Sequence, residues 1–189
     1  LGEITEALAV AHRAGVVHRD IKPENILLSG RHALVMDFGV AKAVTEASGR
    51  QQLTTAGVAL GTPAYMAPEQ ATADPQLDHR VDIYALGCTA YWLLTGDLPF
   101  YATNTVQMLF KQANEAPPKP SRVRGDLPEG LDDVIAKALD KSPDRRFGTC
   151  SDLMAAARAV VDAAGPLAET TPPRRTGSMP PDVRPAIDE

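Results

Sequence analysis

The run His18-Arg19-Asp20-Ile21-Lys22-Pro23-Glu24-Asn25 decides how the rest of this chain is interpreted. Two shorter signatures follow it in order, Asp37-Phe38-Gly39 and Ala67-Pro68-Glu69. A three-residue match arises easily by chance, whereas a long run followed by two further signatures at suitable intervals does not. The carboxylate, ammonium and amide groups in these clusters suit phosphoryl transfer, which needs charges that position phosphate oxygens and metal ions.

In this order and spacing, the three clusters resemble those of bacterial, eukaryotic-like (Hanks-type) serine/threonine protein kinases. The resemblance covers roughly residues 1–164. It implies an α+β fold, namely the large catalytic lobe of a kinase, mainly α-helical, with a small β-hairpin that carries the catalytic loop and Asp-Phe-Gly. It also implies ATP and Mg²⁺ as cofactors, with Mn²⁺ as an alternative metal, and proteins with Ser or Thr hydroxyls as phosphoryl acceptors.

The composition is that of a soluble globular protein, with 44% apolar and 23% charged residues. A net charge of −5 gives no reason to expect nucleic acid or an anionic membrane as partner. Cys88 and Cys150 form no CxxC pair, so no disulfide framework or zinc site is indicated and a reducing cytoplasm fits best. The remaining histidines share no metal-ligand spacing and are expected at the surface or in turns: His12, His32 and His79.

Hydrophobic periodicity predicts a mainly helical chain with one small hairpin. Helices are expected at 2–14 and 81–94, with two or three more at 103–114, 130–140 and 150–164. Short strands are expected at 25–28 and 33–36, a loop at 43–60 and a break at 117–120. From Gly165 onward, six prolines in 25 residues predict a disordered tail, so the domain boundaries are placed at 1–164 and 165–189.

No stretch of the chain approaches the ~20 apolar residues that a membrane span needs, and its first residues form no signal peptide. The sequence therefore predicts no membrane contact within this chain. The tail is interpreted as a linker toward a membrane span or sensor module in a longer parent protein. The oligomeric state stays open.

The resemblance assigns chemical roles to five residues. Asp20 would accept a hydrogen bond from the incoming hydroxyl, and Lys22 would place its ammonium on the γ-phosphate. Asn25 would supply a neutral oxygen to one Mg²⁺, and Asp37 a carboxylate to the metal that bridges the β- and γ-phosphates. Leu27 would form part of the floor under the adenine, although a plain core leucine would look the same. Taken singly, an Asp or Asn in a loop is more often a turn former or a helix cap.

The segment before the Ala-Pro-Glu signature points to serine or threonine as acceptor. By the resemblance, Thr62 would hydrogen-bond Asp20 and Lys22. Tyr65 and Met66 would border the pocket for the residue that follows the target.

Residues 39–61 would form the activation segment. Arg19 would be a buried guanidinium without a counter-charge unless it finds an anion, and a phosphate supplies about −2 charges. Thr54 and Thr55 are therefore the candidate phosphosites. Unmodified polar loop residues remain the alternative for each of them.

Five further residues are assigned structural roles by the resemblance. His18 would pack and hydrogen-bond, with Phe38 stacked near it, and would not act as a general base. Asp82 would accept hydrogen bonds from the backbone of the catalytic loop. Glu69 and Arg146 would form a buried ion pair that braces the lobe.

The small lobe of a kinase has no counterpart in the 189 residues. No GxGxxG occurs, and Val40-Ala41-Lys42 follows Asp-Phe-Gly, so it cannot be the lysine strand. The chain is therefore expected to be a fragment of a longer kinase, with weak nucleotide affinity and little turnover alone.

Two alternatives to a protein kinase remain. The first is a non-catalytic, kinase-like interaction module, although such modules often lose Asp20, Asn25 or Asp37, and all three are present. The second is a small-molecule kinase, which is less favoured because residues 61–69 resemble a segment that holds a peptide.

Overall fold

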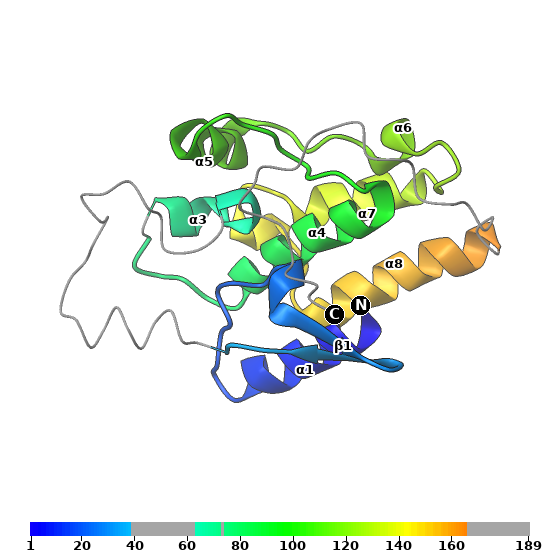
Figure 1. Cartoon of the computed structure of the whole chain (residues 1–189), viewed down its shortest axis with the longest axis horizontal. Coiled ribbons are helices and arrows are strands. Elements are labelled where there is room, and N and C mark those ends of the chain that lie inside the picture. The colour runs from blue at the N-terminus through cyan, green and yellow to red at the C-terminus, as the bar shows by residue number, and fades with distance from the viewer. Residues whose placement is uncertain (39–62, 73, 166–189) are drawn as a thin grey trace, which may run out of the picture.

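A computed structural model describes residues 1–38, 63–72 and 74–165 (Figure 1). The helices are α1 (Gly2–Arg13), α3 (Pro68–Ala71), α4 (Arg80–Thr95), α5 (Thr105–Asn114), α6 (Pro120–Val123), α7 (Gly130–Ala138) and α8 (Cys150–Ala164). The strands are β1 (Ile26–Ser29) and β2 (His32–Val35), and the 3₁₀ turns are η1 (Pro23–Asn25), η2 (Pro63–Tyr65) and η3 (Pro143–Arg145). The described part is therefore mainly helical with a small two-stranded sheet, as the sequence predicted.

Helix α4 forms the centre of the core, and every residue from Val81 to Tyr91 is buried. Gly87 lets α7 approach closely, because a Cβ at this position would lie 2.9 Å from the Cβ of Ala138. The helix ends at Gly96, whose φ of 81° is a conformation that side chains resist. Because this stretch of α4 is packed on all sides, its own polar side chains, such as that of Asp82, are held in fixed places.

The hairpin of β1 and β2 is antiparallel, with Ile26 opposite Val35 and Ser29 opposite His32. In Figure 1 it lies beside α1, and β2 is in contact with that helix. Both strands begin one residue away from the predicted positions, because the register depends on the turn at Gly30, where φ is 61°. The hairpin joins the run His18–Asn25, the candidate catalytic run, to Asp37 and Phe38, the described part of the Asp-Phe-Gly signature.

Some elements were not predicted. Helices α3 and α6 each span one turn, too short for a periodic apolar pattern. The proline run does separate α5 from α7, but its last residue, Pro120, also begins α6, because a proline suits the first position of a helix. The predicted loop at 43–60 lies outside the described residues, as does the tail after Gly165.

Candidate active site

The centre of the candidate site is a cluster of three side chains from the catalytic run. The ammonium of Lys22 lies 2.9 Å from Oδ2 of Asp20. The amide of Asn25 donates to the backbone oxygen of Asp20 at 2.7 Å and to its Oδ2 at 3.1 Å. In the described part of the chain, Oδ1 of Asp20 takes no hydrogen bond, so it can accept one from an incoming hydroxyl.

A single 3₁₀ turn folds Asn25 back onto Asp20. Pro23 begins η1 with its fixed φ, and the N–H of Asn25 bonds the carbonyl of Lys22 at 3.0 Å. Asn25 is consequently buried, 8% exposed, whereas the side chains of Asp20 and Lys22 are 26% and 18% exposed. The carboxylate and ammonium thus keep access to solvent above a buried amide.

Asp82, at the start of α4, anchors the backbone of the catalytic run. Its fully buried carboxylate accepts the N–H of His18 at 2.9 Å and that of Arg19 at 2.7 Å. Arg19 has a φ of 70°, a left-handed conformation that costs about 1–2 kcal/mol, so these two bonds help to offset strain next to Asp20.

The expectation that His12 lies at the surface or in a turn was wrong. Its Nε2 lies 2.7 Å from Oδ2 of Asp82, and its side chain is only 9% exposed. The contact joins α1 to α4 across 70 residues, which no sequence spacing reveals. His32 is exposed, as expected, and bonds Glu3 at 2.7 Å, whereas His79 is half-buried and bonds the carbonyl of Gly148 at 2.8 Å.

The hairpin fixes the residues on both sides of Asp37. The N–H of Met36 bonds the carbonyl of Asn25 at 2.9 Å, and Nε2 of His18 donates to the carbonyl of Met36 at 2.7 Å. The rings of Phe38 and His18 meet edge to face, with centroids 4.8 Å apart. Asp37 itself is exposed with a φ of 61°, and among the described residues its carboxylate has no hydrogen-bond or ion-pair partner.

Both ring nitrogens of His18 are engaged. Its Nε2 donates to Met36, and its Nδ1 accepts the N–H of Asp20 at 3.3 Å. A buried ring with both nitrogens occupied has no position from which to take a proton, so the arrangement favours a packing role for His18.

The two candidate metal ligands fit Mg²⁺ by their chemistry. The amide of Asn25 uses its nitrogen toward Asp20, which leaves Oδ1 as a neutral oxygen ligand, and Asp37 offers a carboxylate. Mg²⁺ takes one or two such oxygens together with phosphate oxygens and water. No group of three or more His, Cys, Asp or Glu among residues 1–38, 63–72 and 74–165 could hold a metal by itself.

The segment that would receive the substrate is η2 and the residues after it. Tyr65 is 6% exposed, and burial raises the pKa of its hydroxyl above the ordinary range. Met66 is half-buried, and its N–H bonds the carbonyl of Pro63 at 3.3 Å. Thr62, the expected partner of Asp20, lies outside the described residues, as do the candidate phosphosites Thr54 and Thr55.

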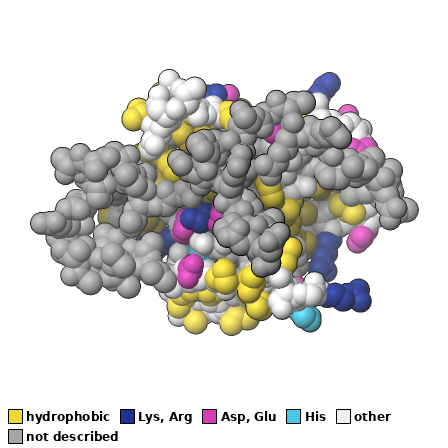
Figure 2. All heavy atoms as spheres, viewed as in Figure 1, with side chains coloured by type: hydrophobic (Ala, Val, Ile, Leu, Met, Phe, Trp, Pro, Cys, Tyr) yellow, Lys and Arg dark blue, Asp and Glu magenta, His cyan; other side chains and the backbone are white. Residues whose placement is uncertain are grey.

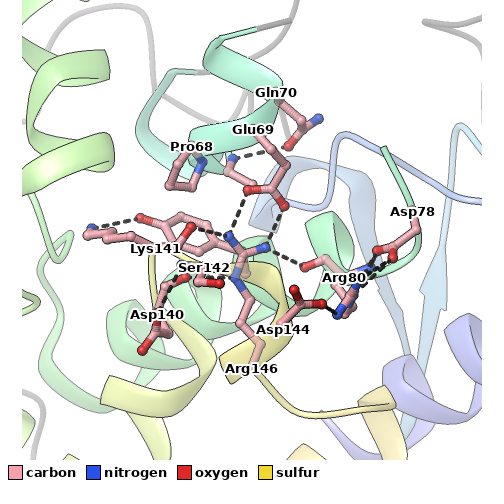
Figure 3. A network of polar contacts seen from close by, with 12 residues as sticks. Pro68, Glu69, Gln70, Asp78, Arg80, Asp140, Lys141, Ser142, Asp144 and Arg146 are labelled. Carbon is pink, nitrogen blue, oxygen red and sulfur yellow. Dashed lines mark hydrogen bonds and ion pairs between the residues drawn. The ribbon is translucent and has the colours of Figure 1, made fainter. Parts of the chain in front are cut away.

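The side chains of Glu69, on α3, and Arg146 point toward one another (Figure 3). The two guanidinium nitrogens Nη1 and Nη2 donate to the two carboxylate oxygens of Glu69 at 2.6 and 2.7 Å. The next residue, Gln70, was given no role by the sequence. Its amide donates to the carbonyl of Arg19 at 2.9 Å, so α3 is tied both to the brace and to the catalytic run.

Hydrophobic side chains are exposed along the hairpin. Leu27 is 48% exposed and Leu28 76%, and Figure 2 shows apolar side chains gathered over this part of the molecule. Leu34, Met36 and Phe38 are exposed by 51%, 37% and 36%. Leu27 and Leu34 are paired across the two strands, so they lie on the same face of the hairpin, whereas Leu28 lies on the other.

Residues 1–157 match the model of the protein kinase domain. The chain belongs to the protein kinase family. It is 40% identical over 156 residues to the serine/threonine-protein kinase PknB of Mycolicibacterium smegmatis, which covers 82% of this chain and 24% of the relative. It is 44% identical over 160 residues to the serine/threonine-protein kinase PknE of Mycobacterium tuberculosis, which covers 84% of this chain and 27% of the relative.

The chain therefore spans about a quarter of the length of these two kinases. Among the described residues of this kinase chain, no helix is both long and apolar enough to cross a bilayer. Its two cysteines, Cys88 and Cys150, are buried and unpaired.

Proposed function

We propose that the protein to which this chain belongs is a serine/threonine protein kinase, and that residues 1–164 form its large lobe. The observation that carries the proposal is the cluster of Asp20, Lys22 and Asn25, whose backbone is anchored by Asp82. The hairpin brings Met36, the residue before Asp37, into contact with Asn25, and the Asp37 carboxylate has no partner in the described part. Such a cluster supplies positioning and charge, which are what phosphoryl transfer requires. The free cysteines favour a cytoplasmic location for this reaction.

The geometry suggests how the transfer proceeds. Oδ1 of Asp20 accepts the proton of a serine or threonine hydroxyl while the hydroxyl oxygen attacks the γ-phosphorus of ATP. The bond from that phosphorus to the bridging oxygen breaks, and ADP leaves with the electron pair. The ammonium of Lys22 offsets the charge on the γ-phosphate. Mg²⁺, held by Asn25 and Asp37, would neutralise the phosphate oxygens.

A second lobe is part of the proposal. The exposed apolar side chains of Leu27 and Leu34 on one face of the hairpin suit contact with a second lobe that covers ATP, with Leu27 under the adenine. The 189 residues contain no Gly-rich loop that could cover the phosphates. We therefore expect this chain alone to bind nucleotide weakly and to turn over little.

We further propose that phosphorylation of the activation segment completes the site. The Nε of Arg19 is buried and has no hydrogen-bond partner in the described part of the chain. A phosphate on Thr54 or Thr55 would supply the missing acceptor and counter-charge. Mass spectrometry of the active protein, with Thr54→Ala and Thr55→Ala variants, would locate it.

Transfer of labelled γ-phosphate from ATP to a generic basic protein tests the proposed function. The 189-residue chain is compared with the full-length product of its gene, each with and without Mg²⁺. We expect Mg²⁺-dependent transfer by the full-length protein only. Ready autophosphorylation by the 189 residues would contradict the need for a second lobe, and no transfer by either would favour the interaction module.

The Asp37→Asn variant of the full-length protein should need much more Mg²⁺. The substitution keeps an oxygen ligand but removes its charge, and even indirect metal contacts are worth about 10–100-fold in affinity or activity. We expect the half-saturating Mg²⁺ concentration to rise by at least that factor in a transfer assay at fixed ATP. Asp133→Asn, an exposed carboxylate on α7, is the control. Equal Mg²⁺ curves for both variants would remove Asp37 from the metal site.

A further inference from the structure

Gln112 is a fully buried amide on α5, and the sequence gave no reason to single it out. Its Nε2 donates to the carbonyl of Ala64 at 2.7 Å and to that of Pro63 at 3.3 Å. Its Oε1 accepts a short hydrogen bond from the hydroxyl of Tyr84. The side chain therefore connects α5 and α4 to the backbone of η2, the turn that leads into Tyr65.

Lys141 belongs to the same network, because it contacts Tyr84. Its ammonium donates to the hydroxyl of Tyr84 at 3.3 Å and lies 4.4 Å from the ring centre of Phe100. Burial lowers the pKa of the half-buried Lys141 to about 8. The guanidinium of Arg146 lies over the same Tyr84 ring, 4.8 Å from its centre. The network thus links the Glu69 brace to η2 through buried polar groups.

Fixing two carbonyls restricts the orientation of the peptide units that carry them. The carbonyls of Pro63 and Ala64 belong to the residues immediately before Tyr65 and Met66. An unpaired carbonyl in this buried setting would be costly, so the pairing selects one conformation of the turn. Gln112 makes no hydrogen bond to the catalytic run in the described part of the chain.

We propose that Gln112 is a positioning residue for the protein substrate, because its amide holds η2 in the shape that receives the residue after the phosphorylated serine or threonine. The inference rests on the proposed function. It assigns the setting of the peptide pocket to a side chain on α5 that touches neither ATP nor the reacting hydroxyl.

The substitution Gln112→Met tests this role, because methionine has similar length but cannot donate to either carbonyl. We expect the KM for a serine peptide to rise at least about 5-fold, the lower end of the cost of an unpaired buried group. The KM for ATP should stay within about 2-fold. Gln112→Leu, which removes both donors without adding an ionisable group, is the second variant should Gln112→Met fold poorly.

Two controls separate positioning from stability. Gln107→Met makes the same change on the exposed side of α5 and should alter neither KM. Tyr84→Phe removes a hydroxyl from the same network while leaving both donors of Gln112 facing η2. It should lower the melting temperature without raising the peptide KM, whereas Gln112→Met should change both.

The measurements use the full-length protein, namely initial rates at varied peptide and ATP, and equilibrium binding of a peptide with alanine in place of the acceptor. Peptide binding that is weaker in the Gln112 variants but unchanged in Gln107→Met and Tyr84→Phe supports the proposal. Unchanged binding, or an ATP KM that rises in parallel, overturns it. A parent protein that binds the peptide but transfers no phosphate contradicts the proposed function only, and the binding comparison then decides the role of Gln112. A parent that binds no peptide overturns both.

Discussion

Replacing Asp20 with asparagine should lower kcat for phosphoryl transfer by about 10²–10⁴-fold, the range of a general acid or base. The side chain keeps its shape, but the group that faces the hydroxyl loses its charge and its basicity. The ammonium of Lys22 and the amide of Asn25, 2.9 and 3.1 Å from Oδ2, hold the carboxylate in place. Because the substitution preserves this packing, its effect should fall on the chemical step, as a loss of about 3–5 kcal/mol of transition-state stabilisation.

The experiment compares kcat, nucleotide affinity and melting temperature of the full-length protein with those of Asp20→Asn and Asp133→Asn. Asp133 is exposed on α7 and should tolerate the change. We expect Asp20→Asn to bind ATP like the parent and to melt within a few degrees of it. A kcat within 10-fold of the parent would remove Asp20 from the reaction and favour the interaction module.

The sequence predicted the parts of the site that are local in the chain. Asp20 and Asn25 lie five positions apart, and one 3₁₀ turn suffices to bring them together. The hairpin then brings Met36, just before Asp37, next to Asn25, so two signatures that are close in sequence become neighbours. Helix α4 was predicted for a similar reason, because its apolar run is long enough to leave no other assignment.

Contacts between distant elements could not be predicted in this way. His12 meets Asp82 across 70 residues, and Gln112 meets Ala64 across 48. Both contacts depend on how helices pack, and a lone histidine or glutamine carries no signal of its partner. Glu69 and Arg146, 77 residues apart, were paired beforehand only through the resemblance to kinases.

Arg146→Ala should lower the free energy of unfolding by about 3–5 kcal/mol, the cost of leaving one partner of a buried ion pair alone. The guanidinium side chain is fully buried, and that of Glu69 is 10% exposed. Besides the Glu69 carboxylate, the N–H groups of Arg146 also bond three backbone carbonyls, those of Arg80 at 3.0 Å, Asp140 at 2.8 Å and Lys141 at 3.4 Å (Figure 3). The substitution to alanine therefore leaves one carboxylate and three carbonyls without their hydrogen-bond donor. A lysine at this position could not reproduce the bidentate contact with Glu69.

Arg145 provides the matched control, because it is the neighbouring arginine and also forms an ion pair. Its Nε lies 2.9 Å from Asp140, but its side chain is 68% exposed, and exposed pairs contribute at most about 1 kcal/mol. Urea unfolding of the parent, Arg145→Ala and Arg146→Ala should therefore separate the two positions by at least about 2 kcal/mol. The Glu69→Gln substitution should lower the free energy of unfolding less in the Arg146→Ala variant than in the parent, because the Glu69 carboxylate has already lost its partner in that variant. Similar losses at both arginines would mean that the buried pair does not brace the fold.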